Sequence, residues 1–147
     1  MKNDVEYSVA NPGDILSIVK LVKECGLPYE DINQEKLKSF IVAKINNSII
    51  GCIGIEIFNH DGLLRSLAVN NEYRNQEIGG ELYRKLLSFS TKSGVTTLHL
   101  LTTTAENYFI KKGFIKTDRS NAPQTIKVTA EFSTLCSSSS TYMVLQN

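Results

Sequence analysis

Apolar residues near the N-terminus recur at the spacing of an amphipathic helix. Ile15, Ile18 and Val22 fall on one helical face, and Gly26 follows as a stop signal. The preceding segment, Val5–Ala10, is predicted to form a strand. We therefore expect the chain to begin with a strand and then a helix.

Three extended apolar segments follow, and short polar turns join them. The segments are Phe40–Ile45, Ile49–Phe58 and Leu63–Val69, and the turns fall at Asn46–Asn47 and Asn59–Gly62. Asn and Gly suit such turns because they tolerate a positive φ. This arrangement predicts a β-meander built from hairpins, with the middle segment, apolar on both faces, near the centre of the sheet.

The rest of the pattern alternates helices with short strands. The order of elements becomes β-α-α-β-β-β-α-β-α-β-α-β, which predicts an α/β (α+β) fold around a mixed sheet. The length of 147 residues fits one domain covering 1–147. Helices are expected over residues 33–39, 78–90, 104–112 (capped by Thr104) and 123–133, and strands over 97–101, 114–116 and 141–145.

Composition and charge narrow the class of partner. The net charge of +1 gives no basic field for nucleic acid, and no apolar run reaches the ~18 residues of a membrane span. The first residues lack the apolar core of a secretory signal, so a cytoplasmic protein is expected. Three cysteines without a CxxC spacing indicate neither a disulfide framework nor a structural metal site.

The polar loop after Val69 is the most informative segment. A strand ends there, and a helix begins near the pair Gly79–Gly80. Unpaired N–H groups at a helix start bind phosphate oxygens, and glycine lets the phosphate approach the backbone. Arg74 adds a bidentate donor for the same anion. The segment Arg74–Gly80 is therefore a candidate anion cradle, although a plain strand–loop–helix junction with a surface arginine fits the same residues.

The same segment resembles the acetyl-CoA motif of the GNAT superfamily of N-acetyltransferases, [RQ]-x-x-G-x-[GA]. Arg74 matches its first position and Gly79 its last, and Ala105–Phe114 is similar to the family's A-x-x-F-Y-x-x-x-G-F helix. Three further stretches look like a GNAT branch linked to arsenic resistance. They are Leu64–Val69, Leu100–Ala105 and Thr129–Cys136.

The resemblance implies a GNAT-like, mostly antiparallel sheet of about six or seven strands flanked by helices. The central strands, Leu63–Val69 and Thr97–Leu101, would splay apart around the pantetheine arm of acetyl-CoA. The N–H of Val69 would polarise the thioester carbonyl. The implied cofactor-binding residues are Leu67, Ala68, Val69, Arg74, Asn75, Gln76, Glu77, Ile78, Gly79, Gly80 and Asn107.

Two residues depart from the family pattern. Glu77 replaces a glycine, where a Cβ disfavours a left-handed backbone and a carboxylate aimed inward would repel a diphosphate. We expect its side chain to point to solvent and cofactor binding to survive. Phe109 replaces a tyrosine that often protonates the leaving thiolate, and phenylalanine has no proton to give. Its neighbour Tyr108 is the candidate replacement, and packing is the alternative role.

The acceptor end is predicted from one pair of charged residues. If the hairpin turn is centred between His60 and Asp61, Glu56 lies opposite Arg65, and a cross-strand ion pair follows. The pair is either structural or lines the acceptor pocket, where Glu56 would recognise the amine or order water. Ser66 would face the opposite side of a regular strand. By resemblance alone, Arg119 is a further substrate-binding candidate.

The function expected from these residues is transfer of acetyl from acetyl-CoA to a small-molecule primary amine, by direct attack in a ternary complex. Two alternatives remain: acetylation of protein lysines or N-termini, and a non-catalytic acyl-CoA-binding regulatory module. The expected partners are the amine alone, with neither nucleic acid nor membrane nor a metal. The protein is expected to be a monomer or a homodimer.

Overall fold

Seven strands form one open sheet in the computed structural model, which describes residues 4–74, 77–136 and 139–146. The strand order is β1-β2-β3-β4-β5-β7-β6. β4 pairs with β5 in parallel, and the other pairings of the described strands are antiparallel, as predicted. The strands are β1 (Glu6–Val9), β2 (Phe40–Ile45), β3 (Ser48–Phe58), β4 (Asp61–Val69), β5 (Thr97–Thr102), β6 (Ile115–Lys116) and β7 (Thr141–Gln146).

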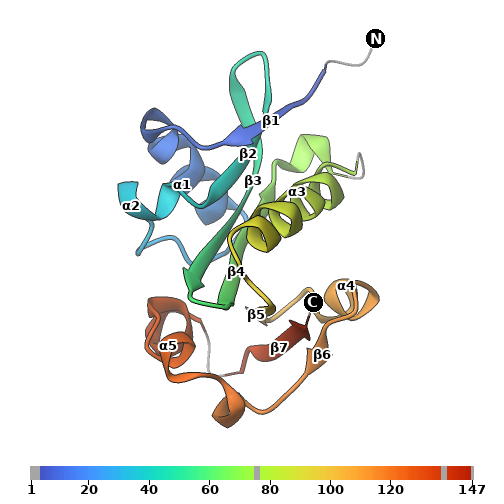
Figure 1. Cartoon of the computed structure of the whole chain (residues 1–147). Coiled ribbons are helices and arrows are strands. Elements are labelled where there is room, and N and C mark those ends of the chain that lie inside the picture. The colour runs from blue at the N-terminus through green and yellow to red at the C-terminus, as the bar shows by residue number, and fades with distance from the viewer. Residues whose placement is uncertain (1–3, 75–76, 137–138, 147) are drawn as a thin grey trace.

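Helices cover both faces of the sheet, with α1 and α2 on one side and α3 on the other (Figure 1). The two longer helices, α1 and α3, bury an apolar stripe, such as Ile78, Leu82 and Leu86 of α3, because apolar side chains leave water without losing hydrogen bonds. The helices are α1 (Ile15–Glu24), α2 (Gln34–Leu37), α3 (Ile78–Lys92), α4 (Glu106–Lys111) and α5 (Gln124–Lys127), followed by a π-helical turn over Glu131–Leu135.

The β3–β4 hairpin has a different register from the predicted one. Phe58 pairs with Asp61, so the turn is centred between Asn59 and His60, and Glu56 lies opposite Leu63 rather than Arg65. The reason is a tight two-residue turn in which Asn59 adopts a φ of 57°. Gly62 therefore belongs to the strand, where an added Cβ would lie 2.6 Å from Ile55 Cδ1.

The expected helix over 123–133 is wrong, because the segment is broken after α5. Thr129 Oγ1 donates to the carbonyl of Ile126 at 2.7 Å and accepts from the N–H of Phe132 at 3.3 Å. A side chain that bonds the local backbone in this way competes with helix propagation. The predicted cap Thr104 is also wrong: α4 begins at Glu106, and Thr102 Oγ1 accepts from the N–H of Ala105 at 2.9 Å.

A bulge interrupts β4 at Ser66. Arg65 pairs with Gly54, but Ala68 pairs with Cys52, so Ser66 and Leu67 together oppose one residue of β3. Ser66 has a φ of 58°, a left-handed conformation that is rare for a residue with a Cβ. The expectation that Ser66 faces away from Arg65 is therefore wrong: Arg65 Nε donates to Ser66 Oγ at 3.0 Å.

Candidate active site

The central strands β4 and β5 separate after a short parallel contact. Asp61–Leu63 pairs with Thr97–His99, and beyond these residues the two strands diverge. A cavity of about 1040 Å³ opens between them, and residues 64–69 and 100–105 line its two sides. The predicted splay of the central strands is confirmed, and the volume suits a large cofactor and a small second molecule.

The main chain of Val69 turns into this opening. The N–H of Asn70 donates to the carbonyl of Ile50 at 2.7 Å, and hydrogen-bonded pairs alternate along an antiparallel ladder. The Val69 N–H and carbonyl therefore point away from β3, toward the separated side of β4. The bulge at Ser66, three residues earlier, determines this orientation, because an extra residue changes which amides face the neighbouring strand.

The N-terminus of α3 forms the other end of the cavity. Ile78, Gly79 and Gly80 line the wall, and the N-cap residue, Glu77, makes no side-chain hydrogen bond to the first turn. An added Cβ at Gly79 would lie 3.7 Å from Val69 Cγ2, so packing does not require glycine there. What glycine provides is open access to the backbone N–H groups.

Glu77 adopts the left-handed backbone that its Cβ disfavours, with a φ of 61°. Its side chain is exposed and also lies at the edge of the cavity, where it adds a negative charge beside the helix N-terminus. Asn75 and Gln76, which the resemblance adds to the cradle, lie outside the described residues.

Arg74 contacts the end of β4. Its Nε donates to the carbonyl of Val69 at 3.3 Å, and its Nη2 lies 3.6 Å from Cys25 Sγ. Cys25 Sγ in turn lies 3.7 Å from the Val69 carbonyl. Arg74 is exposed and lines the same cavity as the first residues of α3, so its guanidinium is available to an anion bound there.

The α4 helix presents Tyr108 to the cavity and buries Phe109. Phe109 is 6% exposed and packs edge-on against Phe114, with ring centroids 5.5 Å apart. Tyr108 is 37% exposed, and burial of part of its ring raises the pKa of its hydroxyl, which therefore stays protonated at neutral pH. Asn107, on the same helix, is exposed and is not among the lining residues.

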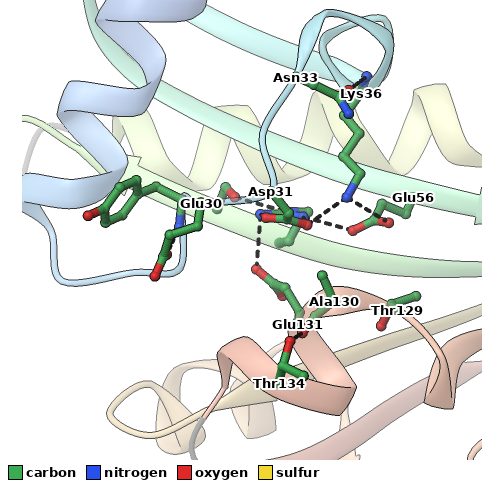
Figure 2. Close-up of polar contacts among 12 residues, drawn as sticks. Glu30, Asp31, Asn33, Lys36, Glu56, Thr129, Ala130, Glu131 and Thr134 are labelled. Atoms are coloured by element: carbon green, nitrogen blue, oxygen red, sulfur yellow. Dashed lines mark hydrogen bonds and ion pairs between the residues drawn. The ribbon is translucent and has the colours of Figure 1, made fainter.

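Four charged residues gather around Arg65, which lines the cavity, and Figure 2 shows these four close together. Arg65 Nη1 contacts Asp31 Oδ2 and lies 2.8 Å from Glu56 Oε2, and its Nη2 lies 2.7 Å from Asp31 Oδ1. Lys36 Nζ lies 2.6 Å from Asp31 Oδ2 and 3.6 Å from Glu56 Oε1. Glu131 Oε2 lies 3.4 Å from Arg65 Nη2. We call this group the Arg65 cluster: Asp31, Lys36, Glu56, Arg65 and Glu131.

The predicted Glu56–Arg65 ion pair is therefore present, although it is diagonal across the strands. The roles of Asp31, Lys36 and Glu131 were not predicted from the sequence. Asp31 lies in a loop, Lys36 on a one-turn helix and Glu131 on the π-helical turn, so no local spacing relates them to Arg65. Only the packing of three distant segments against β4 brings them together.

Burial raises the pKa values of the Asp31 and Glu131 carboxyls, and the positive charges of Arg65 and Lys36 lower them. Burial disfavours ionisation of Asp31, but hydrogen bonds from Arg65 and Lys36 outweigh it and lower its pKa to about 2. Burial also dominates at Glu131 and raises its pKa to about 7 against the attraction of Arg65. The side chain of Arg65 is fully buried, with five donor contacts to four neighbours.

The remaining candidates lie close to the cavity but outside its lining. Arg119 Nη2 donates to Ser140 Oγ at 2.9 Å, and Ser140 lines the cavity. His99 is buried between two partners, with Nε2 2.8 Å from Asp61 Oδ1 and Nδ1 2.6 Å from the Tyr142 hydroxyl. It is a hydrogen-bonded core residue.

Among the described residues, no helix has the length and apolar character needed to cross a membrane. Within the same ranges, no group of three or more His, Cys, Asp or Glu side chains is arranged as a metal site.

A splayed sheet with an anion cradle at a helix start is the architecture of an acyl-CoA-dependent acetyltransferase fold. The family model of the GNAT acetyltransferases matches residues 16–114. The chain therefore belongs to the GNAT acetyltransferase family.

Similar proteins include two amino-acid acetyltransferases. The one from Pseudomonas fluorescens is 28% identical over 123 residues, which are 80% of this chain and 28% of that protein. The one from Shewanella oneidensis is 25% identical over 122 residues, 80% of this chain and 27% of the relative. The chain thus spans little more than a quarter of the length of these relatives.

Solved structures show the same fold at low identity. The N-acetylglutamate synthase from Neisseria gonorrhoeae, complexed with coenzyme A and N-acetyl-glutamate, has a TM-score of 0.84 and 19% identity, covering 99% of this chain and 36% of that one. The PaiA N-acetyltransferase from Thermoplasma acidophilum, complexed with coenzyme A, has a TM-score of 0.72 and 17% identity. The match covers 98% of this chain and 99% of that one.

Proposed function

We propose that this protein is an acetyl-CoA-dependent N-acetyltransferase that acts on the primary amine of a small molecule. One observation supports this above all: a single cavity has an anion cradle at one end and the outward-turned main chain of Val69 along its wall. We also propose that residues 1–147 function as one acetyltransferase unit.

The cradle and the strand would hold the two parts of acetyl-CoA. The diphosphate would accept hydrogen bonds from the N–H groups of Ile78, Gly79 and Gly80, beside Arg74. The pantetheine arm would lie along Leu67–Val69, whose exposed main-chain groups would complete the edge of β4 as a further strand does. Because the shape is preformed, little ordering would be needed on binding.

Acetyl transfer would then follow because the amine and the thioester are held next to each other. The neutral amine nitrogen attacks the thioester carbonyl carbon, the C–N bond forms, and the oxyanion accepts a hydrogen bond from the Val69 N–H. The C–S bond breaks, and the thiolate takes a proton from the Tyr108 hydroxyl or from water. The proton lost by the amine passes to water. Holding both reactants in one cavity would supply much of the acceleration.

The kind of amine that accepts the acetyl group is inferred from the relatives and from the residues around Arg65 and Ser140. The relatives named amino-acid acetyltransferases favour an α-amino acid as the first amine to test. Arg119, behind Ser140, is our candidate for a carboxylate of that acceptor. Glu56 and Arg65 would act at this end by ordering the wall, since each already pairs within the Arg65 cluster. The arsenic-resistance resemblance stays a prediction.

The direct test is release of coenzyme A from acetyl-CoA in the presence of an amine panel. The panel holds the α-amino acids, simple primary amines, an amine that bears arsenic and a lysine peptide. We expect an acceptor-dependent rate with one of the small amines. A rate with the peptide alone would replace this proposal by protein acetylation.

A second candidate function is a non-catalytic acyl-CoA-binding module. Phe109, buried among aromatic rings where many relatives place a proton donor, is the observation that favours it. Tight binding of acetyl-CoA without release for any amine of the panel would support the module and contradict the enzyme.

A further inference from the structure

The acceptor end of the cavity has a wall made by the C-terminal segment. Leu135, the last residue of the π-helical turn, and Cys136, the next residue, line the cavity, and the N–H of Cys136 donates to the carbonyl of Glu131 at 2.9 Å. The position of this wall is therefore tied to the backbone of Glu131. The side chain of Glu131 is 5% exposed and contacts Arg65 of β4, on the opposite side of the cavity end.

The charges of the Arg65 cluster do not balance when every group is ionised. Asp31 and Glu56 match Arg65 and Lys36, two acids against two bases, and Glu131 is a third acid. Those four groups are the charges that act on Glu131 from the neighbouring elements, and Cys136 is the titratable group on its own segment. An unpaired carboxylate is costly to bury, whereas its protonated form is not.

We propose that Glu131 is a positioning residue that fixes the acceptor wall, and that the wall is closed while Glu131 is protonated and loosens when it ionises. The protonated carboxyl stays buried and accepts from Arg65 Nη2. The ionised carboxyl gives the cluster an excess negative charge and favours exposure, which moves Leu135 and Cys136 with it. This inference refines the proposed function, because it assigns these residues to the acceptor end.

The size of the effect follows from linkage. If the pKa of Glu131 is about 7 in the closed wall and near its ordinary 4.5 in the open one, the open-to-closed ratio rises roughly fourfold between about pH 6.5 and about pH 8.5. The direction is fixed by the sign of the shift: a raised pKa means that the closed wall binds the proton more tightly. Raising the pH therefore opens it.

Thiol labelling measures this opening without any acetyl transfer. Cys136 and Cys25 both line the cavity, whereas Cys52 is fully buried. The protein is labelled with 4,4′-dithiodipyridine at the two pH values, and peptide mass spectrometry gives the Cys136-to-Cys25 rate ratio. Dividing by the same ratio measured in urea-unfolded protein corrects for the different intrinsic reactivities of the two thiols. We expect the corrected ratio to rise about fourfold with pH.

Variants separate the role of Glu131 from a general effect of pH. In Glu131→Gln the corrected ratio should be low and independent of pH, and the acceptor KM at about pH 8.5 should fall while the Kd of coenzyme A is unchanged. Glu106→Gln is the matched control and should behave as the wild type. It removes an acid of α4 that pairs with Lys116 of β6.

The outcomes distinguish this inference from the proposed function. A corrected wild-type ratio that does not change with pH overturns the inference even if acetyl transfer is found. A rise with pH in a protein that transfers no acetyl supports the movement of the wall and refutes only the enzyme assignment. If Glu131→Gln does not fold, the unfolded-state correction still decides the question on the wild type.

Discussion

At the scale of single residues, the proposed cradle contains one residue with an unfavourable backbone conformation and two side chains of opposite charge. Glu77, the N-cap of α3, is left-handed and negative, and Arg74, bonded to the end of β4 in the same cavity, is positive. The carboxylate and a bound diphosphate would repel each other by about 1 kcal/mol at ~4 Å in water. In the proposed site, diphosphate binding would therefore be weakened by the charge of Glu77 and strengthened by that of Arg74.

Glu77→Gln is expected to lower the Kd of coenzyme A about fivefold, because it removes that ~1 kcal/mol of repulsion and keeps the Cβ. Glu77→Gly removes the charge and also the unfavourable contact of the Cβ, so its Kd should be at least as low. Isothermal titration calorimetry gives both values. An unchanged Kd in both variants would mean that the carboxylate lies away from the diphosphate.

Arg74→Ala is expected to raise the Kd of coenzyme A roughly ten- to hundredfold, since a hydrogen bond to a charged group contributes about 1.5–3 kcal/mol. Arg84→Ala is the control, because Arg84 pairs with Glu81 at 2.8 Å on the exposed side of α3. Calorimetry with equal loss of affinity in both variants would argue for a diffuse charge effect instead of a direct contact.

Tyr108→Phe is expected to lower kcat about tenfold or more with little change in the Kd of coenzyme A, because a positioned general acid contributes at least that much. Stopped-flow measurement of thiol release gives kcat directly. A variant with the wild-type kcat would assign protonation of the thiolate to water and leave Tyr108 a packing role.

At the scale of elements, β4 determines the shape of the cavity and the main-chain groups that face it. Its bulge at Ser66 sets which amides of Leu67 and Val69 face the opening, and its separation from β5 makes the opening itself. The strand thus provides the main-chain groups of the site, and neighbouring elements provide the charged side chains. A one-residue shift in the pairing of β4 with β3 would turn the Val69 N–H away from the cavity.

Ser66→Val is expected to destabilise the fold by about 1–3 kcal/mol, because a β-branched residue resists the φ of 58°. Ser66→Gly loses the same Oγ acceptor of Arg65 Nε but fits this φ, so it should keep the bulge and be more stable than Ser66→Val. Urea unfolding measures both free energies. Equal stabilities for the two variants would show that the bulge is not constrained at this φ.

The elements were predictable from the sequence to a large extent, because their signals are local. Strand β2 and the start of α3 at Ile78 follow from apolar spacing, and the cradle follows from Arg74 and the glycine pair. The register of β3–β4 and the bulge were not, because a left-handed Ser66 has no distinctive sequence. The Arg65 cluster also escaped prediction, since Asp31 and Glu131 reach Arg65 only through tertiary packing.

At the scale of the whole molecule, the cluster joins segments from both ends of the chain to the centre of the sheet. Asp31 belongs to the N-terminal third and Glu131 to the C-terminal segment, and both contact Arg65 of β4. Global stability should therefore depend on pH in two separate ranges. The two acids have opposite signs, because the pKa of one is lowered by folding and that of the other is raised.

The acid limb belongs to Asp31, whose folded pKa of about 2 lies below its ordinary 3.8. Its stabilisation is complete above 3.8 and is lost as the pH falls toward 2. Glu131 acts in the other direction: stability falls as the pH rises from 4.5 to about 7. Thermal unfolding against pH should show a flatter neutral limb in Glu131→Gln and an unchanged acid limb. A neutral limb identical to the wild type would contradict the assignment.

The most direct test of the central claim, that the opening between β4 and β5 holds acetyl-CoA on the α3 cradle, is calorimetric titration of acetyl-CoA into the protein. We predict one site per chain, a Kd within the roughly micromolar to millimolar range of such co-substrates, and weaker binding in Arg74→Ala than in Arg84→Ala. No heat of binding at millimolar acetyl-CoA, or binding that Arg74→Ala leaves unchanged, would contradict it.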